Sequence, residues 1–439
     1  MKILLSYYIL ILTSINSFSQ SFDIYNNIFL KDYSYKLIET LDHHSFYNYP
    51  KTVKLDNSIN NLLDPIIQLN SSEKLKLAFD ILSSEYSSYA YTFIHCDSKW
   101  NYSDMSQAEY LDGFFHNYIE TYSYSFNTIP DYIYYECEFP NENINFKKSG
   151  NYIVLVYNTE NNKPIITKRF MVNENLVKID SEIQLSSLPR ERDTNQEINL
   201  YITNIEKLNI QDPNNELKII IQKNDNWNDI IIAPKPSFYN NQKIEYNQQN
   251  FISFPGGSEY RDFDIKSLRY YGKNILNIEN KLIQGNTIYL VTLYQDIIEN
   301  SENYKFKYDL NGKYVTSVSE NKNKNTEGNY ALVKFTLQKP KLNNKDIYIY
   351  GELTNWDILP EAKMIFDDIN NNYYGLLYLK QGYYNYEYIS LDMNNEITFL
   401  KNNHKETRNK YSNYVYYRPR SSHYDRLVGV NKNTSNGLN

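Results

Sequence analysis

The segment Gly150-Asn-Tyr-Ile-Val-Leu-Val-Tyr157 is a short run of aromatic and branched apolar residues that begins at a glycine. Such a run is typical of a buried β-strand. The polar turn Asn161-Asn-Lys-Pro164 follows it, and residues 165–172 are again mostly apolar. The two runs and the turn between them predict a β-hairpin.

Strand patterns continue on both sides of this hairpin. Residues 120–127 alternate between aromatic and hydroxyl side chains, which is typical of a half-buried strand. Long helical periodicity is absent. The sequence therefore predicts an all-β fold of tandem immunoglobulin-like or early-set β-sandwich domains. Further predicted strands cover residues 89–96, 132–139, 177–185, 196–203, 288–294, 304–310, 330–337, 346–351, 373–379, 383–390 and 414–418.

The chain has three tryptophans, Trp100, Trp227 and Trp356, and each follows a strand-like run and a short polar step. Their intervals are 127 and 129 residues (227 − 100 and 356 − 227), a typical domain length. This period is too long for a solenoid repeat and indicates three successive β-domains, with chance placement as the alternative. Successive domains favour an extended recognition protein over an enzyme with a single pocket.

These patterns divide the chain into five segments. Residues 317–328 are polar and rich in Asn and Lys, which is typical of a linker. The predicted segments are a signal peptide at 1–19, an N-terminal β-sandwich domain at 20–174, a middle β-sandwich domain at 175–328, a C-terminal early-set-like β-sandwich at 329–430 and a disordered tail at 431–439.

The first residues predict export. Lys2 precedes a mostly apolar run from Ile3 to Leu12, and small residues follow at Ser17 and Ser19. The run is too short to anchor the chain in a bilayer, and no cysteine lies near it for a lipid anchor. A formal net charge of −7 with no basic stripe argues against nucleic-acid binding. The 46 tyrosines fit either AT-rich codon usage or an adhesive surface.

The two cysteines, Cys96 and Cys137, lie in predicted strands of the first domain. An exported protein permits a disulfide between them, and two buried free thiols are the alternative. The sequence leaves this choice open.

No motif requires catalysis. Adjacent His95 and Cys96 would face opposite sides of a strand, and no nucleophile elbow or phosphate-binding loop occurs. The segment Asp368-Ile-Asn-Asn-Asn372 begins like a calcium loop but lacks the required glycine and the closing glutamate. Carboxylate pairs such as Glu109 with Asp112 fit a solvated face better than a glycosidase site. We predict a non-enzymatic protein without catalytic, cofactor-binding or metal-binding residues.

Two aromatic motifs lie near the C-terminal end, Gly351-Glu-Leu-Thr-Asn-Trp-Asp357 and Gly382-Tyr-Tyr-Asn-Tyr-Glu-Tyr388. They resemble the early-set immunoglobulin-like modules of starch- and glycogen-binding proteins. In those modules, aromatic residues stack on sugar rings. The alternative, which the sequence favours, is that Trp356 only covers the end of the sandwich, because spacing identifies no second aromatic platform.

A longer set of motifs occurs in order along nearly the whole mature chain. The motifs are Tyr91-Thr-Phe-Ile-His-Cys-Asp-Ser-Lys-Trp100, Glu109-Tyr-Leu-Asp-Gly-Phe114, Tyr124-Ser-Phe-Asn-Thr128, Phe139-Pro-Asn141, Ser149-Gly-Asn-Tyr152, Lys168-Arg-Phe-Met-Val172, Gly257-Ser-Glu-Tyr-Arg-Asp-Phe-Asp264, Leu379-Lys-Gln-Gly-Tyr-Tyr-Asn-Tyr386, Tyr416-Tyr-Arg-Pro419 and Tyr424-Asp-Arg-Leu-Val-Gly429. This set closely resembles the type IX secretion system plug protein family of Bacteroidota. Two features depart from the family pattern: Gly257 replaces a more frequent Asn before Ser258, and Cys137 is outside the signature.

The resemblance implies a periplasmic protein that plugs the periplasmic opening of the outer-membrane translocon barrel, called SprA or Sov, until cargo arrives. It implies that barrel as the partner, without a cofactor. The alternatives are a carbohydrate-binding protein of the cell envelope and an exported hydrolase with a scattered active site. The sequence names no partner-binding residue. Signature residues such as Trp100, Trp227, Trp356 and Asp262 fit purely structural roles, and a buried Arg261 is expected to pair with a carboxylate.

Overall fold

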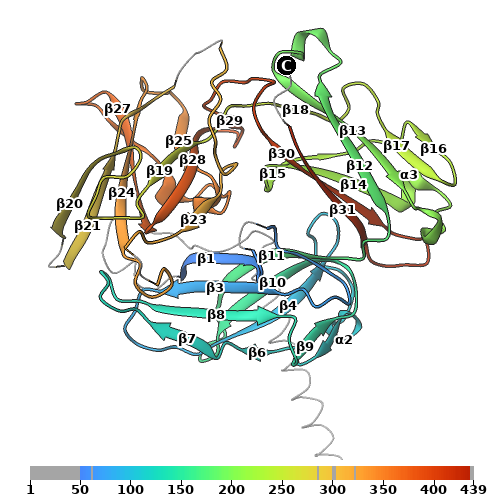
Figure 1. Cartoon of the computed structure of the whole chain (residues 1–439), viewed down its shortest axis with the longest axis horizontal. Coiled ribbons are helices and arrows are strands. Elements are labelled where there is room, and N and C mark those ends of the chain that lie inside the picture. The colour runs from blue at the N-terminus through green and yellow to red at the C-terminus, as the bar shows by residue number, and fades with distance from the viewer. Residues whose placement is uncertain (1–49, 61–62, 284–285, 299–302, 321–322, 436–439) are drawn as a thin grey trace, which may run out of the picture.

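The computed structural model describes residues 50–60, 63–283, 286–298, 303–320 and 323–435. The predicted signal peptide and the residues up to 49 lie outside this part of the chain. The sheets form three units that meet at a common centre (Figure 1). Unit one spans residues 50–174, unit two combines residues 175–255 with 410–435, and unit three spans residues 261–399. The all-β prediction of tandem β-sandwich domains is confirmed.

Unit one is a sandwich of two sheets. Its first sheet has the order β1 (Pro50–Asn57), β3 (Leu75–Ile81), β8 (Ile133–Phe139) and β7 (Thr121–Tyr124). Its second sheet has the order β2 (Ile66–Gln68), β11 (Pro164–Asn173), β10 (Gly150–Asn158), β4 (Tyr89–Cys96) and β6 (Asn117–Tyr118). A short helix α2 (Gln107–Tyr110) and the small pair β5 (Leu111–Gly113) and β9 (Ile144–Phe146) complete it.

The position of strand β10 between two cores explains why its sequence is apolar without interruption. Tyr152 and Val154 face the core between the two sheets of unit one. Ile153 and Leu155 point the other way, into a second core shared with unit two. Because successive strand residues face opposite sides, a strand covered on both faces has no position for a solvated side chain. The predicted hairpin is confirmed by the antiparallel pairing of β10 with β11.

Unit two contains two sheets from distant parts of the chain. One has the order β12 (Lys178–Leu185), β13 (Asn195–Thr203), β17 (Lys243–Tyr246) and β16 (Phe238–Tyr239), and β18 (Ser253–Pro255) also pairs with β13. The other has the order β15 (Asn226–Ile232), β14 (Leu217–Lys223), β30 (Lys410–Tyr417) and β31 (Arg426–Thr434). Short helical turns lie at η2 (Pro189–Glu191), η3 (Glu206–Leu208) and α3 (Pro213–Glu216).

Unit three lies between β18 and β30 in the chain. One sheet is built on the long strand β28 (Gly382–Asp392), which pairs with β19 (Arg261–Asp264), β23 (Tyr314–Thr316), β25 (Lys345–Tyr350) and β29 (Ile397–Phe399). The other has the order β20 (Ile275–Ile283), β21 (Asn286–Leu293), β24 (Tyr330–Gln338), β27 (Asn372–Lys380) and β26 (Ile365–Asp367), with β22 (Asp296–Ile297) also on β24. The turns η4 (Glu352–Thr354) and η5 (Pro360–Ala362) follow β25.

The sheets divide the chain differently from the predicted boundaries. Strands β20 and β21 belong with β24, across the expected division at 328 and 329. Strand β30 pairs along its length with β14, so the end of the chain completes unit two instead of unit three. Unit three is therefore an insertion into unit two, joined to it by residues 256–260 and 400–409. Long-range pairing of this kind leaves no local sequence signal.

Three smaller predictions also fail. Residues 304–310 form no strand. Residues 431–434, expected in a disordered tail, continue β31 and pair with β30, where Lys410 lies opposite Thr434. Within the expected linker at 317–328, the described residue Thr326 contacts unit one, where the backbone N–H of Phe126 donates to its carbonyl at 2.8 Å. Polar composition alone did not distinguish a packed connection from a free one.

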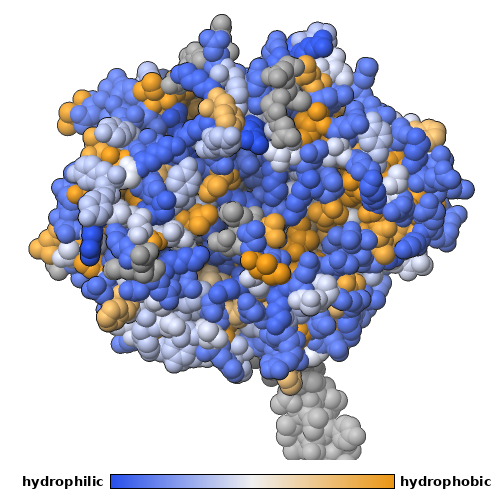
Figure 2. Space-filling model, viewed as in Figure 1, coloured by the Kyte–Doolittle hydropathy of each residue, from blue (hydrophilic) through white to orange (hydrophobic). Residues whose placement is uncertain are grey.

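The surface is mostly hydrophilic in the view of Figure 2, and hydrophobic residues gather around its centre, where the three units meet. No helix in the described ranges is long and apolar enough to cross a membrane.

Candidate functional site: the cavity between the three units

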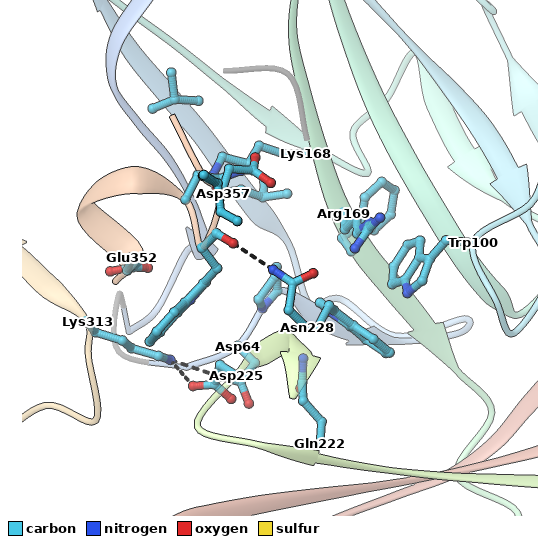
Figure 3. Close-up of a pocket in the computed structure, with 18 of the residues that line it drawn as sticks. Asp64, Trp100, Lys168, Arg169, Gln222, Asp225, Asn228, Lys313, Glu352 and Asp357 are labelled. Atoms are coloured by element: carbon cyan, nitrogen blue, oxygen red, sulfur yellow. Dashed lines mark hydrogen bonds and ion pairs between the residues drawn. The ribbon is translucent and has the colours of Figure 1, made fainter. Parts of the chain in front are cut away.

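A cavity of about 750 Å³ lies at the junction of the three units (Figure 3). Unit one lines it with residues of β1 and β11, and unit two with the turn between β14 and β15. Unit three contributes Lys313, Glu352 and residues 355–360 around η4. A cavity of this size falls in the range of ligand sites in proteins.

All three tryptophans line this cavity. The sequence placed one in each successive domain, and the structure brings Trp100 from unit one, Trp227 from unit two and Trp356 from unit three to the same space. The even spacing of the tryptophans therefore corresponds to one tryptophan in each unit, although the spacing did not predict that all three would line one cavity.

Each tryptophan follows a tight turn beside a strand. Trp100 and Trp356 have left-handed backbone conformations, with φ of 68° and 58°. Trp227 follows Asn224 and Asp225, which also have positive φ, as a two-residue hairpin turn requires. A bulky side chain at positive φ is uncommon, and such strain persists only where packing fixes the residue.

The tryptophans pack against one another and against neighbouring aromatic rings. The rings of Trp100 and Trp227 meet edge to face, with centroids 5.0 Å apart. Trp227 stacks on Tyr414 of β30 at 5.4 Å. The side-chain amide of Asn228 donates to the backbone carbonyl of Trp356 at 2.6 Å, which joins the turns of units two and three.

A network of ion pairs joins the units beside the cavity. Asp64 of unit one lies 3.0 Å from Lys313 of unit three and 2.7 Å from both Lys410 and Lys432 of unit two. Asp225 of unit two lies 2.6 Å from Lys313 and 2.7 Å from Lys410. Each unit thus supplies at least one member, and Figure 3 shows Lys313 reaching toward both aspartates.

Burial and pairing oppose each other at these charges. Burial alone would raise the pKa of Asp64, but Lys313, Lys410 and Lys432 outweigh it and hold that pKa far below its ordinary value. Burial would lower the pKa of Lys313, but Asp225 and Asp64 raise it well above the ordinary value. Both groups are therefore charged at neutral pH, and the network acts as an electrostatic junction between units.

A second buried junction joins unit one to unit three. Lys380 of β27 lies 2.7 Å from Asp80 of β3, and their side chains are only 3% and 1% exposed. The hydroxyl of Tyr330 donates to the same carboxylate oxygen at 2.6 Å. Burial raises the pKa of Asp80 and lowers that of Lys380, because each charge is costly away from water, so neither group tolerates loss of its partner.

The junction of units one and two is mainly apolar. It is the second core described for β10, and it includes Ile94, Ile220, Tyr416 and Leu427. Arg426 pairs with Glu174 at its edge, at 2.6 Å.

The signature residues outside the cavity have structural roles. Arg261 is half-buried and pairs with Asp296 at 2.8 Å, which confirms the expected carboxylate partner. Asp262 is buried and accepts hydrogen bonds from Lys273, Lys307 and Tyr383. Burial opposes the ionisation of Asp262, but these bonds outweigh it and lower its pKa.

Neither cysteine forms a disulfide. Cys96 and Cys137 are free, and they lie on different sheets of unit one. Cys96 faces the core shared with unit two, whereas His95 on the same strand contacts Tyr152, so the two side chains point to opposite sides as expected. Burial raises the pKa of the Cys96 thiol, which makes it a poor nucleophile.

Among the described residues, acidic side chains at the cavity pair with lysines instead of forming a metal site. In the part of the chain that the structure describes, no group of three or more His, Cys, Asp or Glu could hold a metal ion. Three of the four carboxylates at the cavity, Asp64, Asp225 and Glu352, each pair with lysine. Sequence analysis missed Asp64, Lys313 and Lys410, because isolated charged residues carry no spacing signal.

The fold and the cavity define an all-β protein of three sandwich units that ion pairs and a shared apolar core hold together. Residues 51–174 match the family model described as the first domain of the type 9 secretion system plug protein. The chain belongs to the type IX secretion system plug protein family.

A solved structure is similar to most of the chain. The crystal structure of a hypothetical protein from Parabacteroides merdae shares 30% sequence identity, with a TM-score of 0.83, and the match covers 88% of this chain and 97% of that chain. The C-terminal domain of the antigen I/II-family protein AspA from Streptococcus pyogenes shares 7% identity with a TM-score of 0.18, too little to inform the fold. No curated protein matches the chain.

Proposed function

We propose that this protein is a non-enzymatic periplasmic component of the type IX secretion system that plugs the periplasmic opening of the outer-membrane SprA-type barrel until cargo arrives. Membership of the plug family is the observation that carries the proposal. The protein would associate peripherally with the translocon and not with nucleic acid or lipid.

The architecture is suited to this task for a mechanical reason. A pore of domain size cannot be closed by one side chain, so it needs a body that keeps its shape. Two buried ion-pair junctions and an apolar core fasten the three units. The insertion of unit three into unit two adds a further restraint, because two chain segments connect these units instead of one.

A carbohydrate-binding role has weaker support. That role needs an exposed aromatic pair that includes Trp356, but Trp356 is only 9% exposed. Its ring packs against Tyr260 and Tyr350, and Gly312 lies against its edge. The tryptophan therefore covers the end of a core, as the favoured alternative in the sequence analysis held.

The test is an affinity pull-down of tagged mature protein from detergent-solubilised envelopes of the native host. Recovery of the translocon barrel at a fixed ratio supports the proposal, and cross-linking of that complex would then map the interface. Retention on insoluble glucan without the barrel would transfer the role to carbohydrate binding. A preparation that never contains a large outer-membrane barrel would refute the plug.

A further inference from the structure

Two of the residues that line the cavity each carry a buried hydrogen-bond donor. The indole nitrogen of Trp100 and the side-chain amide nitrogen of Gln222 find no acceptor among the described residues. Both residues line the cavity, and they are only 4% and 2% exposed. A buried donor without an acceptor costs about 1–3 kcal/mol, so native proteins rarely leave one without a reason.

The two donors belong to one cluster around Trp227. Trp100 meets the ring of Trp227, and Trp227 stacks on Tyr414. The hydroxyl of Tyr414 in turn donates a hydrogen bond to the side-chain oxygen of Gln222 at 2.8 Å. This bond sets the orientation of the Gln222 amide and leaves its nitrogen without a partner among the described residues.

The charges that line the cavity balance. Four cations line it, Lys54, Lys168, Arg169 and Lys313, and four anions, Asp64, Asp225, Glu352 and Asp357. Lys410 and Lys432 do not line the cavity, but both pair with Asp64. The chain as a whole carries a formal charge of −7, so the lining is less negative than the chain.

The unused groups distinguish between classes of ligand. A carboxylate only accepts hydrogen bonds, so it would satisfy both donors and add no donor of its own. Sugar hydroxyls both donate and accept, and sugars stack on free aromatic faces. Here Tyr414 covers one face of Trp227, and the Arg169 guanidinium lies over Trp100 at 4.9 Å. The rest of the wall includes the apolar side chains of Ile358 and Leu359.

We propose that the cavity is a binding site for a carboxylate carried on an apolar body, as the C-terminal end of a peptide with apolar last residues presents. The carboxylate accepts from the Trp100 indole and the Gln222 amide, and the apolar body lies against Trp227 and Ile358. This inference does not depend on the plug proposal, because it concerns the purified chain alone.

The tryptophans provide the assay, since all three of them line the cavity. Their fluorescence is titrated with acetyl-alanyl-leucyl-leucine as the free acid, and in parallel with the same peptide as its C-terminal amide. We expect saturable binding of the acid, and binding of the amide weaker by about tenfold or more, because hydrogen bonds to a charged group are the stronger ones.

Two variants test the donors separately. Gln222→Glu keeps the acceptor for Tyr414 but turns the unused donor into an acceptor, and Trp100→Phe removes the indole N–H while Trp227 and Trp356 still report. We expect each to weaken binding of the acid by about tenfold or more. Gln242→Glu, at an exposed turn of unit two, makes the same charge change away from the cavity and is expected to bind like the parent.

Circular dichroism and melting curves establish that each variant is folded. Equal binding of acid and amide would overturn the carboxylate assignment. Binding of a maltooligosaccharide in place of the peptide would overturn it in favour of a sugar. A titration in which no ligand changes the fluorescence of the folded parent would mean a cavity that holds only solvent, and would refute the site.

Discussion

Replacing Asp80 by Asn tests whether the buried junction holds unit one to unit three. The change leaves Lys380 inside the protein without its counter-charge, and a buried ion pair that loses one partner costs about 3–5 kcal/mol. Two features place the expected loss near the lower end. Burial already lowers the pKa of Lys380, so it can release its proton, and an amide oxygen can still accept from Tyr330. We expect a loss of about 3 kcal/mol.

A double-mutant cycle isolates the pair. Asp80→Asn, Lys380→Met and the double variant are unfolded in urea and followed by tryptophan fluorescence. The double variant removes both charges, so we expect a coupling energy of about 2 kcal/mol. The control is Asp346→Asn in unit three, which removes a surface partner of Lys363, with both side chains about half exposed, and should cost less than about 1 kcal/mol. A coupling energy near zero, or equal losses for Asp80→Asn and the control, would refute the reasoning.

Three further outcomes follow from other parts of the structure. Burial raises the pKa of Glu259, which lies between units two and three, to about 7, so its contribution to stability is complete below about pH 4.5 and is lost as the pH rises toward 7. Glu259→Gln should remove this pH dependence. In urea unfolding at pH 8 the variant should be more stable than the parent by about 1–2 kcal/mol, after allowance for solvent screening. Gly312→Ala would place a methyl group 2.2 Å from the ring of Trp356 at a φ of +83°, and should cost at least about 2 kcal/mol and change the tryptophan emission. Leu155→Ala should cost about 3 kcal/mol of unfolding free energy and increase hydrogen exchange at the junction of units one and two. Val154→Ala, on the other face of β10, should instead increase exchange inside unit one. The same exchange pattern for both variants would contradict the two-core assignment.

Local structure was predictable from the sequence where neighbouring residues decide it. The hairpin of β10 and β11 follows from its apolar runs and turn. The calcium-like segment at 368–372 falls in the polar turn between β26 and β27, as its missing ligands suggested. The alternating aromatic segment forms the edge strand β7, although all four of its side chains are exposed.

The assembly of the units was not predictable in the same way. The pairing of β14 with β30 joins Leu217 to Tyr417 across an inserted unit, and no local pattern specifies such a partner. The ion pairs at the cavity also join residues that are distant in the sequence, since Asp64 and Lys410 are 346 positions apart. Trp100, Trp227 and Trp356 were the one signal that crossed units, because tryptophan is rare in this chain and its spacing is visible.

Under the proposed plug function, the junctions bear on how the protein could leave the barrel. Opening one unit away from another would break the pairs of Asp64 with its three lysines or the pair of Lys380 with Asp80, and would expose the apolar core between units one and two. Movement of the whole body breaks none of these contacts. On that proposal we expect release as an intact body, and variants that weaken the junctions should change the shape of the protein before they change its contact surface.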